Sequence, residues 1–430
     1  MQTLIEELGT KIGQSVTLKG WCYNFRSSGS IFFLQLRDGT GRIQGVISKN
    51  EVSQESWEAC QKLTIESSVI VTGVVTEEKR APSGVELKVS SVEILQVAQE
   101  FPISKKDHGP DFLLDNRHLW LRSSRQEAIM RVRNEIEFSL RLFFYERGFA
   151  LADSPIFTPN ACEGTSDLFA VDYFDRKAYL TQSGQLYQEA TSAALGKTYC
   201  FGPTFRSEKS KTRRHLTEFW MLEPEASFMD WQENMQLQED MTVFVVKRVL
   251  DKRITDLKLL ERDVTVLQKT AEGNFPRITY DEALERLQKA GSDMKWGDDF
   301  GADDETILTK QFDRPVFVHH YPAAIKAFYM KPDPGNPKLA LNNDLLAPEG
   351  YGEIIGGSQR IDDLALLEQR IKEHGLPKEF FSWYLDLRKY GSVPHSGFGI
   401  GLERTVSWIC GLEHVRETIP FPRLLNRLEP

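Results

Sequence analysis

The chain has 430 residues, with 53 Lys and Arg against 62 Asp and Glu, and a formal net charge of −9. This length predicts two or three domains. A hydrophobic content of 40% with 27% charged residues is typical of a globular protein. No apolar run of about 18 residues is present, which excludes a membrane-spanning helix. The acidic balance excludes general coating of nucleic acid, so any such contact must come from local basic patches.

Five cysteines are scattered through the chain, and no pair has the C-x-x-C spacing. This pattern predicts neither a disulfide framework nor a cysteine-rich zinc site. The N-terminal segment carries two Glu and no apolar stretch, so we expect neither a secretory signal nor a transit peptide there. A reducing cytoplasm is the simplest location for the chain.

Residues 1–100 contain five short strand-like segments separated by turn signals such as Asp38-Gly39-Thr40-Gly41. The segments read SVTLKGWCYNF, SIFFLQLRD, GRIQGVIS, SSVIVTGVVTEE and ELKVSSVEILQV. Five short strands predict a small closed β-barrel, and the OB-fold is a common barrel that binds oligonucleotides. A purely structural β domain fits this pattern equally well.

The second of these segments has two distinct faces. Alternation predicts that Phe32, Leu34 and Leu36 lie in the core. Phe33 then lies on the other face between polar residues, as expected for a base-stacking platform.

Residues 101–117 interrupt the strands with two prolines and a glycine, and we expect a hinge there. Residues 118–430 alternate helices and strands in an α+β pattern. A long helix follows the hinge, with a capping-box spacing at Ser124 and Glu127 and a C-terminal cap at Gly148.

Residues 198–228 read as strand, polar loop, strand. On the second strand, alternation places four side chains on one face: Phe219, Met221, Glu223 and Glu225. The loop carries five cationic or titratable side chains: Lys209, Lys211, Arg213, Arg214 and His215. Neighbouring carboxylates repel unless they bind something, and the clustered cations would attract polyphosphate or RNA. A surface hairpin with salt bridges is the alternative.

Near the C-terminus, Gly397, Gly399 and Gly401 precede an apolar helical run with Arg404 in its first turn. Glycines allow close approach of a ligand, and a helix N-terminus favours anions. The G-x-G-x-G spacing, and the fewer than about 30 residues that remain, exclude a dinucleotide-binding doubly wound sheet.

The segment PEGYGEIIGGSQR places Glu353 and Arg360 on or beside one strand, and Asp344 lies nine residues before Glu353. Two separated carboxylates near phosphate-binding arginines would suit Mg²⁺. A glycine-rich bulge with surface acids is the alternative. The acidic stretch DDFGADDE, residues 298–305, is expected to be a solvated loop.

Together these segments resemble the three signature motifs of class II aminoacyl-tRNA synthetases. The motifs are the long helix leading to Pro155, the string FRSE at 205–208 with its loop and return strand, and GIGLER at 399–404. The first hundred residues resemble the anticodon-binding OB domain of the aspartyl/asparaginyl/lysyl subgroup. The strings FGPTFRSEKSKTRRHLTEFWMLEPE, GEIIGGSQR and YGSVPHSGFGIGLER resemble the asparaginyl branch of bacterial type. The resemblance spans about Val16 to Arg423.

The resemblance implies an α+β fold in which an N-terminal OB-fold β-barrel precedes a mainly antiparallel sheet flanked by helices. It implies catalysis by Arg206 and Arg404. The implied ATP site consists of Arg206, Glu208, Arg214, His215, Phe219, Glu353 and Arg404. Arg206 would hold the α-phosphate, Glu208 and Phe219 would contact the adenine, and the other cations would serve the γ-phosphate.

The remaining implied residues form four groups. The asparagine site consists of Glu163, Ser183, Gln185, Glu223 and Arg360. Mg²⁺ would be held by Asp344 and Glu353. The anticodon would be read by Arg26, Phe33 and Gln44. Pro155 would lie at a homodimer interface.

Asparagine is expected rather than aspartate because of two positions. Aspartyl enzymes carry a Lys where this chain has Gln188, and an Asp where it has Glu223. A bound aspartate would therefore face Glu223 with like charge and would lack the offsetting Lys. Such a mismatch costs several kcal/mol, enough for discrimination of order 10³.

The resulting expectation is ligation of asparagine to tRNA(Asn) through an adenylate made from ATP. An aspartyl-tRNA synthetase is the nearest alternative. A ligase that forms an adenylate without tRNA is another, although the barrel with Phe33 and Gln44 disfavours it. A non-catalytic RNA-binding regulator is a third, although Arg206, Arg404 and the acidic pair are all present.

Overall fold

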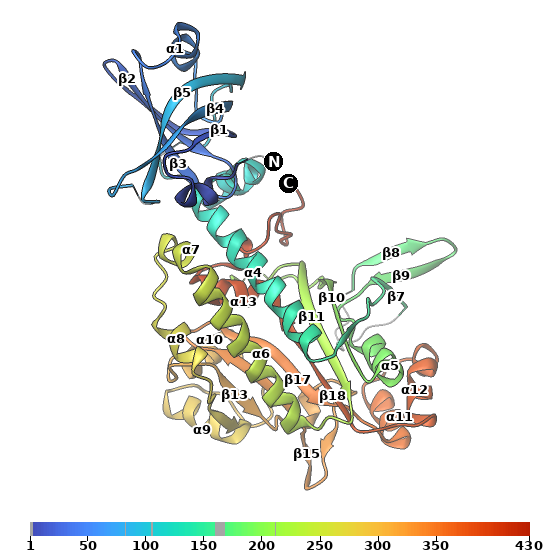
Figure 1. Cartoon of the computed structure of the whole chain (residues 1–430). Coiled ribbons are helices and arrows are strands. Elements are labelled where there is room, and N and C mark those ends of the chain that lie inside the picture. Colours follow the sequence, from blue (N-terminus) through green and yellow to red (C-terminus); the bar gives the residue numbers. More distant parts are fainter. Residues whose placement is uncertain (1–2, 82, 105, 160–167, 211) are drawn as a thin grey trace. The chain divides into compact units, whose positions relative to one another are not determined.

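The computed structural model describes residues 3–81, 83–104, 106–159, 168–210 and 212–430. The chain divides into two compact units, Met1–Leu114 and Asp115–Pro430 (Figure 1). Each unit is described below by itself.

The first unit is a closed five-stranded barrel with strand order β1-β2-β3-β5-β4. Its strands are β1 Ser15–Ser28, β2 Ile31–Arg37, β3 Arg42–Ser48, β4 Ser68–Glu77 and β5 Val85–Gln96. A short 3₁₀ helix, Ile5–Thr10, precedes them, and α1, Gln54–Gln61, lies between β3 and β4. Phe32, Leu34 and Leu36 are buried in the barrel core, as the alternation predicts. The OB-fold prediction is confirmed.

The second unit is built on an eight-stranded sheet with order β12-β13-β16-β17-β18-β11-β10-β6. Its strands pair antiparallel except at the two ends, where β12 with β13 and β10 with β6 are parallel. The strands are β6 Ala150–Leu151, β10 Lys197–Phe205, β11 Glu218–Ser227, β12 Arg277–Thr279, β13 Val316–His319, β16 Asn342–Ala347, β17 Gly352–Gln359 and β18 His395–Gly401. Two small sheets accompany it, formed by β7 Phe157–Thr158, β8 Ala170–Tyr173, β9 Arg176–Leu180, β14 Pro332–Asp333 and β15 Asn336–Ala340.

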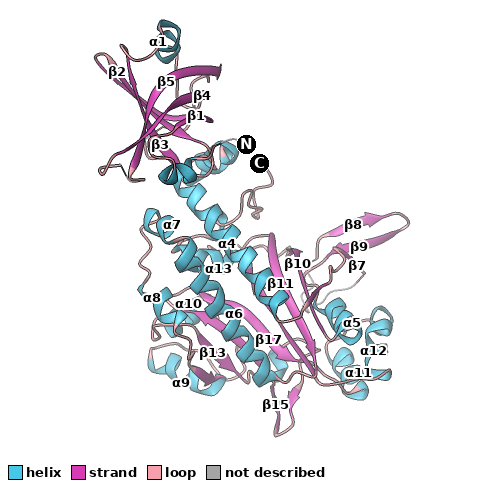
Figure 2. Ribbon diagram, viewed as in Figure 1, coloured by secondary structure: helices cyan, strands magenta, loops and turns pink. Residues whose placement is uncertain are grey.

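Helices flank this sheet, as Figure 2 shows. They are α3 Arg117–Trp120, α4 Ser124–Glu146, α5 Gln185–Leu195, α6 Trp231–Lys252, α7 Ile254–Leu259, α8 Thr265–Ala271, α9 Tyr280–Lys289, α10 Ala302–Thr309, α11 Leu364–Glu373, α12 Ser382–Lys389 and α13 Leu402–Cys410. The remaining helix, α2 Pro110–Asp115, ends at the boundary between the two units. In the described part of the chain, no helix is both long enough and apolar enough to cross a membrane.

The main core lies between the sheet and three helices, α4, α6 and α13. Ile136 and Phe144 of α4, Val245 of α6 and Trp408 of α13 are fully or almost fully buried in one cluster with Phe398 of β18. Burying a side chain of this size stabilises the fold by about 1.5–3 kcal/mol. The same packing fixes β11, β17 and β18, whose opposite face is open.

Two local predictions need correction. The N-cap of α4 is Ser123, whose hydroxyl accepts a hydrogen bond from the Gln126 amide, so the expected Ser124–Glu127 box is wrong by one position. The two serines are adjacent, and sequence alone does not separate them. The acidic stretch 298–305 is not a loop throughout, because α10 begins at Ala302 with three acids in its first turn, where the helix dipole favours them.

Candidate active site

Two adjoining cavities open on the face of the sheet formed by β11, β17 and β18. Four residues line both cavities: Arg206, Met221, Glu353 and Gly399. The second cavity has a volume of about 520 Å³. Because the cavities share these walls, two ligands could meet at Arg206.

The first cavity has an aromatic floor and cationic walls. Phe219 of β11 lines it, and the Arg206 guanidinium lies 5.4 Å from the centre of the Phe219 ring. The Arg206 Nε is buried without a hydrogen-bond partner among the described residues. A buried donor of this kind is costly unless a ligand satisfies it.

Arg404, in the first turn of α13, enters the first cavity from another element. Its Nη1 donates to the backbone oxygen of Glu353 at 2.9 Å and to the Glu353 Oε2 at 3.3 Å. The helix N-terminus beside it also favours an anion. Two arginines from separate elements therefore border one cavity.

Arg214 and His215 come from the loop between β10 and β11. Arg214 donates to Glu305 Oε2 at 2.7 Å and to Thr306 Oγ1 at 2.8 Å. Burial and the nearby Arg404 charge lower the pKa of His215, so its ring favours the neutral form. Glu208 is the exception among the predicted ATP residues, because it lines neither cavity.

Ser183, Glu223 and Gln188 lie together in the second cavity. The Ser183 hydroxyl and the Gly184 amide both donate to the Glu223 carboxylate, the latter at 2.8 Å. Gln188 donates to the Ala152 carbonyl oxygen at 2.6 Å. Glu223 therefore contributes the negative charge at this wall, and Gln188 adds no charge to offset it.

Arg360, at the end of β17, is held rigidly in the same cavity. Its Nε and Nη2 donate to Glu225 of β11 at 3.0 and 2.9 Å, and its Nη1 donates to Ser358 Oγ at 2.7 Å. The pair is almost fully buried, with 3% and 1% of the two side chains exposed. Gln185 also lines the cavity, and its amide donates to Glu189 at 3.1 Å.

Asp344 of β16 and Glu353 of β17 share one face because of a β-bulge. Asp344 pairs with Gly356, but the register shifts by one residue before Leu346, which pairs with Glu353. Without that shift, strict alternation would direct Glu353 to the opposite face from Asp344. A Cβ placed on Gly356 would lie 3.0 Å from Glu353 Oε1 and 3.6 Å from Asp344 Oδ1. The two carboxylates therefore border one small space.

The surroundings of this space shift the pKa values of the two carboxyl groups in opposite directions. Burial and the Glu353 carboxylate raise the pKa of Asp344 to about 6, against the opposing effect of Lys326. Burial also acts to raise the pKa of Glu353, but Arg404, Lys326 and Arg206 outweigh it and hold that pKa below its usual value. Oxygen ligands of this kind, close to arginines that would hold phosphates, fit the chemistry of Mg²⁺.

The predicted anticodon residues lie together on the outer face of the barrel in the first unit. Arg26 of β1 pairs with Phe33 of β2, and its guanidinium lies 4.5 Å from the Phe33 ring centre. Gln44 of β3 pairs with Gln35, which is two residues from Phe33 and so shares its face. The structure therefore brings these three side chains onto one surface.

Two predicted residues lie apart from the cavities. Glu163 is outside the described residues. Pro155 is exposed between β6 and β7 and lines neither cavity.

Among the residues that sequence reasoning missed in the second cavity are two charged ones, Lys326 and Asp299. The Lys326 Nζ lies 3.1 Å from Asp344 Oδ2 and 3.6 Å from Asp299 Oδ1. Neither residue lies in a periodic element or a motif, so no pattern marks them. Asp299 belongs to the acidic stretch that was expected to be solvated.

Comparison with known proteins agrees with this geometry. Residues 109–425 match the model of the family described as tRNA synthetases class II (D, K and N), and residues 16–95 match the OB-fold nucleic acid binding domain. The chain therefore belongs to the class II tRNA synthetases of that group.

Its curated relatives are more specific. The chain is 59% identical to the asparagine--tRNA ligase of Desulforamulus reducens over 428 residues, covering 100% of this chain and 99% of that protein. It is 57% identical to the asparagine--tRNA ligase of Pelotomaculum thermopropionicum, with 100% of both chains covered. Within the class, the chain belongs to the asparagine--tRNA ligase family.

A solved structure is similar over the whole length. The asparaginyl-tRNA synthetase of Pyrococcus horikoshii, complexed with asparaginyl-adenylate, superposes with a TM-score of 0.96 at 47% identity, with 100% of both chains covered.

Proposed function

We propose that this chain ligates asparagine to tRNA(Asn), using ATP and releasing AMP and pyrophosphate. The observation that carries the proposal is the pair of adjoining cavities with Arg206 in their common wall. One cavity has the aromatic floor and arginines that a nucleotide requires, and the other has the polar walls that a small amino acid requires. The family and its relative bound to asparaginyl-adenylate support the same reaction.

In the first step, the carboxylate of asparagine attacks the α-phosphorus of ATP. The bond to the leaving pyrophosphate breaks, and asparaginyl-adenylate forms. Arg206 lies where carboxylate and α-phosphate would meet, and its charge would stabilise the negative charge that develops there. Phe219 would stack on the adenine, while Arg404, Arg214 and His215 would serve the terminal phosphates. This chemistry depends on positioning and charge neutralisation and needs no protein nucleophile.

Mg²⁺ would be held by Asp344 and Glu353. When bound there, the ion would neutralise phosphate charge. The support for this site is the shared face that the bulge creates and the small space above Gly356 that both carboxylates border.

In the second step, the terminal ribose 3′-OH of the tRNA attacks the adenylate carbonyl, AMP leaves, and the aminoacyl ester forms. Arg26, Phe33 and Gln44 would read the anticodon on the barrel, because an aromatic ring beside a guanidinium is a suitable base-stacking surface.

Asparagine would be selected over aspartate by the charge of the second cavity. Arg360 would donate to the side-chain oxygen of the substrate, and Glu223 would accept from its NH₂ group. Aspartate would place a second carboxylate beside Glu223, where Gln188 offers no compensating charge. Glu163, Ser183 and Gln185 would position the α-amino group.

The experiment is ATP–pyrophosphate exchange with asparagine and aspartate side by side, followed by charging of tRNA(Asn). Exchange with asparagine at least about 10³-fold more efficient than with aspartate is expected. Equal exchange with both amino acids would overturn the specificity, and exchange without charging would indicate a ligase that does not use tRNA.

We also propose a homodimer with Pro155 at its interface and a cytoplasmic location. Leu151, Ile156 and Phe157, which flank Pro155, expose 47%, 41% and 52% of their surface, an apolar area that a second copy would cover. Sedimentation at micromolar concentration tests the dimer. The location is supported by the five scattered cysteines, which fit a reducing compartment.

A further inference from the structure

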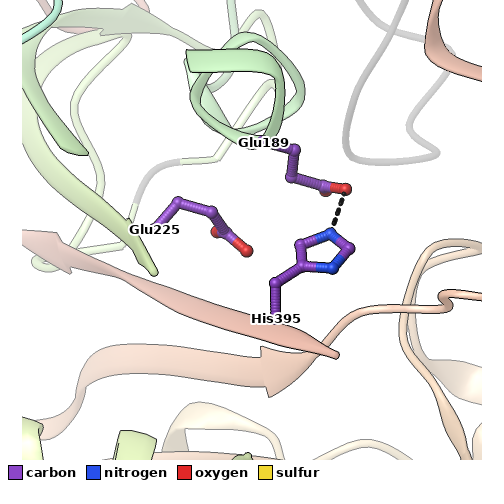
Figure 3. A group of neighbouring side chains, drawn as sticks. All are labelled: Glu189, Glu225 and His395. Carbon is purple, nitrogen blue, oxygen red and sulfur yellow. Dashed lines mark hydrogen bonds and ion pairs between the residues drawn. The ribbon is translucent and has the colours of Figure 1, made fainter. Parts of the chain in front are cut away.

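A buried ionic cluster borders the second cavity, and two of its members, Glu189 and His395, have no role in the mechanism above. It contains Glu189 of α5, Glu225 of β11 and His395 of β18, which converge from three elements (Figure 3). One ligand atom from each of these residues lies within 4.8 Å of the others. The three side chains could in principle hold a metal ion, but their existing partners argue against that.

The Glu189 carboxylate is surrounded by donors from neighbouring elements. Arg388 of α12 donates to it at 2.6 Å, the Tyr384 hydroxyl at 2.8 Å and His395 Nε2 at 2.9 Å. The Glu189 side chain has 0% exposure and that of Arg388 has 1%. Both Glu189 and Glu225 are thus paired with guanidinium groups, and a metal cation would add positive charge to a cluster that already has cations.

The ring of His395 faces an acceptor at each nitrogen. Its Nδ1 lies 2.8 Å from the carbonyl oxygen of Val393, and its Nε2 lies 2.9 Å from the Glu189 carboxylate. A neutral imidazole carries one N–H and would direct a lone pair at one of these oxygens. The N–H at Nε2 would donate to the Glu189 carboxylate, which is the stronger acceptor because it is charged.

The cluster touches the substrate cavity at two places. Glu189 accepts from Gln185 Nε2, and Gln185 lines the cavity. Glu225 accepts from Arg360, which also lines it. Gly397 leaves room for Glu225, because a Cβ on that residue would lie 1.9 Å from Glu225 Oε2.

We infer that His395 is a positioning residue for asparagine, whose Nε2–H donates to the Glu189 carboxylate and, through that carboxylate, fixes Gln185 in the second cavity. The groups that face it are Glu189 from α5, Glu225 from β11, Arg388 and Tyr384 from α12 and Arg360 from the end of β17. This inference deepens the proposed function and rests on it.

The first test is the variant His395→Gln, measured in asparagine-dependent pyrophosphate exchange. The KM for asparagine should rise about ten- to a hundredfold, as expected when a hydrogen bond to a buried charge is lost. The KM for ATP and kcat should stay within about twofold, since the cluster does not line the first cavity. The variant His118→Gln, at an exposed position on α3, is the matched control and should change neither value.

The second test is the ¹⁵N spectrum of the wild-type protein labelled at its eight histidines. The signal that disappears in His395→Gln should show a hydrogen on Nε2, as the hydrogen bond to Glu189 requires. A signal that shows no hydrogen on Nε2, or an unchanged KM for asparagine in His395→Gln, would overturn the inference.

If His395→Gln does not fold, Tyr384→Phe replaces it. This change removes one hydroxyl donor to Glu189 and leaves the ring packing, and a rise of about threefold in the KM for asparagine is expected. No rise would count against the inference. Failure of the wild-type protein to exchange with asparagine would instead refute the proposed function.

Discussion

Replacing Arg206 with alanine tests the proposed reaction most directly. The Arg206 guanidinium lies in the wall shared by both cavities, and its buried Nε has no partner among the described residues. Two hydrogen bonds from this group to an α-phosphate would each contribute about 1.5–3 kcal/mol, because the acceptor is charged. Their loss predicts a decrease of about 10²- to 10⁴-fold in kcat/KM for pyrophosphate exchange.

Two further variants make this measurement specific. Arg206→Lys keeps the charge but not the planar fork, and should fall between wild type and Arg206→Ala. Arg125→Ala removes an arginine that is 46% exposed and paired with Glu417, and should stay within about twofold of wild type. If Arg206→Ala retains exchange within threefold of wild type, the assignment of Arg206 is wrong.

Three other predictions concern separate parts of the chain. Phe33→Ala should weaken tRNA charging by about 1–3 kcal/mol through lost base stacking and leave pyrophosphate exchange intact, and equal loss in both assays would contradict the role of Phe33. Glu223→Gln removes the like charge that faces aspartate, so the preference for asparagine, measured as the ratio of kcat/KM values, should fall by roughly tenfold or more. Burial, together with Arg416, lowers the pKa of His414 to about 4. The unfolded chain binds a proton at His414 below about pH 6.5, whereas the folded chain does not. The free energy of unfolding should therefore decrease between pH 6.5 and 4, by about 1 kcal/mol after solvent screening. Urea unfolding measures this decrease, which should be smaller for His414→Gln.

The residues that sequence predicted best lie on regular strands in the middle of the sheet. Alternation placed Phe219, Met221, Glu223 and Glu225 on one face, and all four line the cavities. The prediction succeeds because β11 pairs on both sides, with β10 and β18, and the pairing with β10 has no bulge along its whole length. Regular pairing preserves the period of two that the argument assumes.

The residues that sequence reasoning missed reach the site by tertiary folding. Lys326 follows a short 3₁₀ turn and has no periodic neighbours, yet its side chain lies beside Asp344. Glu305 belongs to an acidic run that is typical of a solvated surface. It is instead paired with Arg214, and burial together with the Glu353 carboxylate raises its pKa to about 7. Composition predicts only the average environment of a residue type. The actual environments of Lys326 and Glu305 are set by contacts that form when the chain folds.

Because of the register shift between β16 and β17, the face of the sheet on which Glu353 lies depends on the number of residues in both paired strands. Inserting one residue between Leu345 and Leu346 of β16 would give Ile354 a partner, restore uninterrupted alternation and turn the Glu353 carboxylate away from Asp344. Every residue proposed to bind substrate or metal would still be present. A chain with a one-residue insertion here would therefore keep the full set of sequence motifs while its two acids faced opposite sides of the sheet. For a related sequence, the spacing between GEIIGG and the preceding strand is accordingly as informative about metal binding as the identities of the two acids.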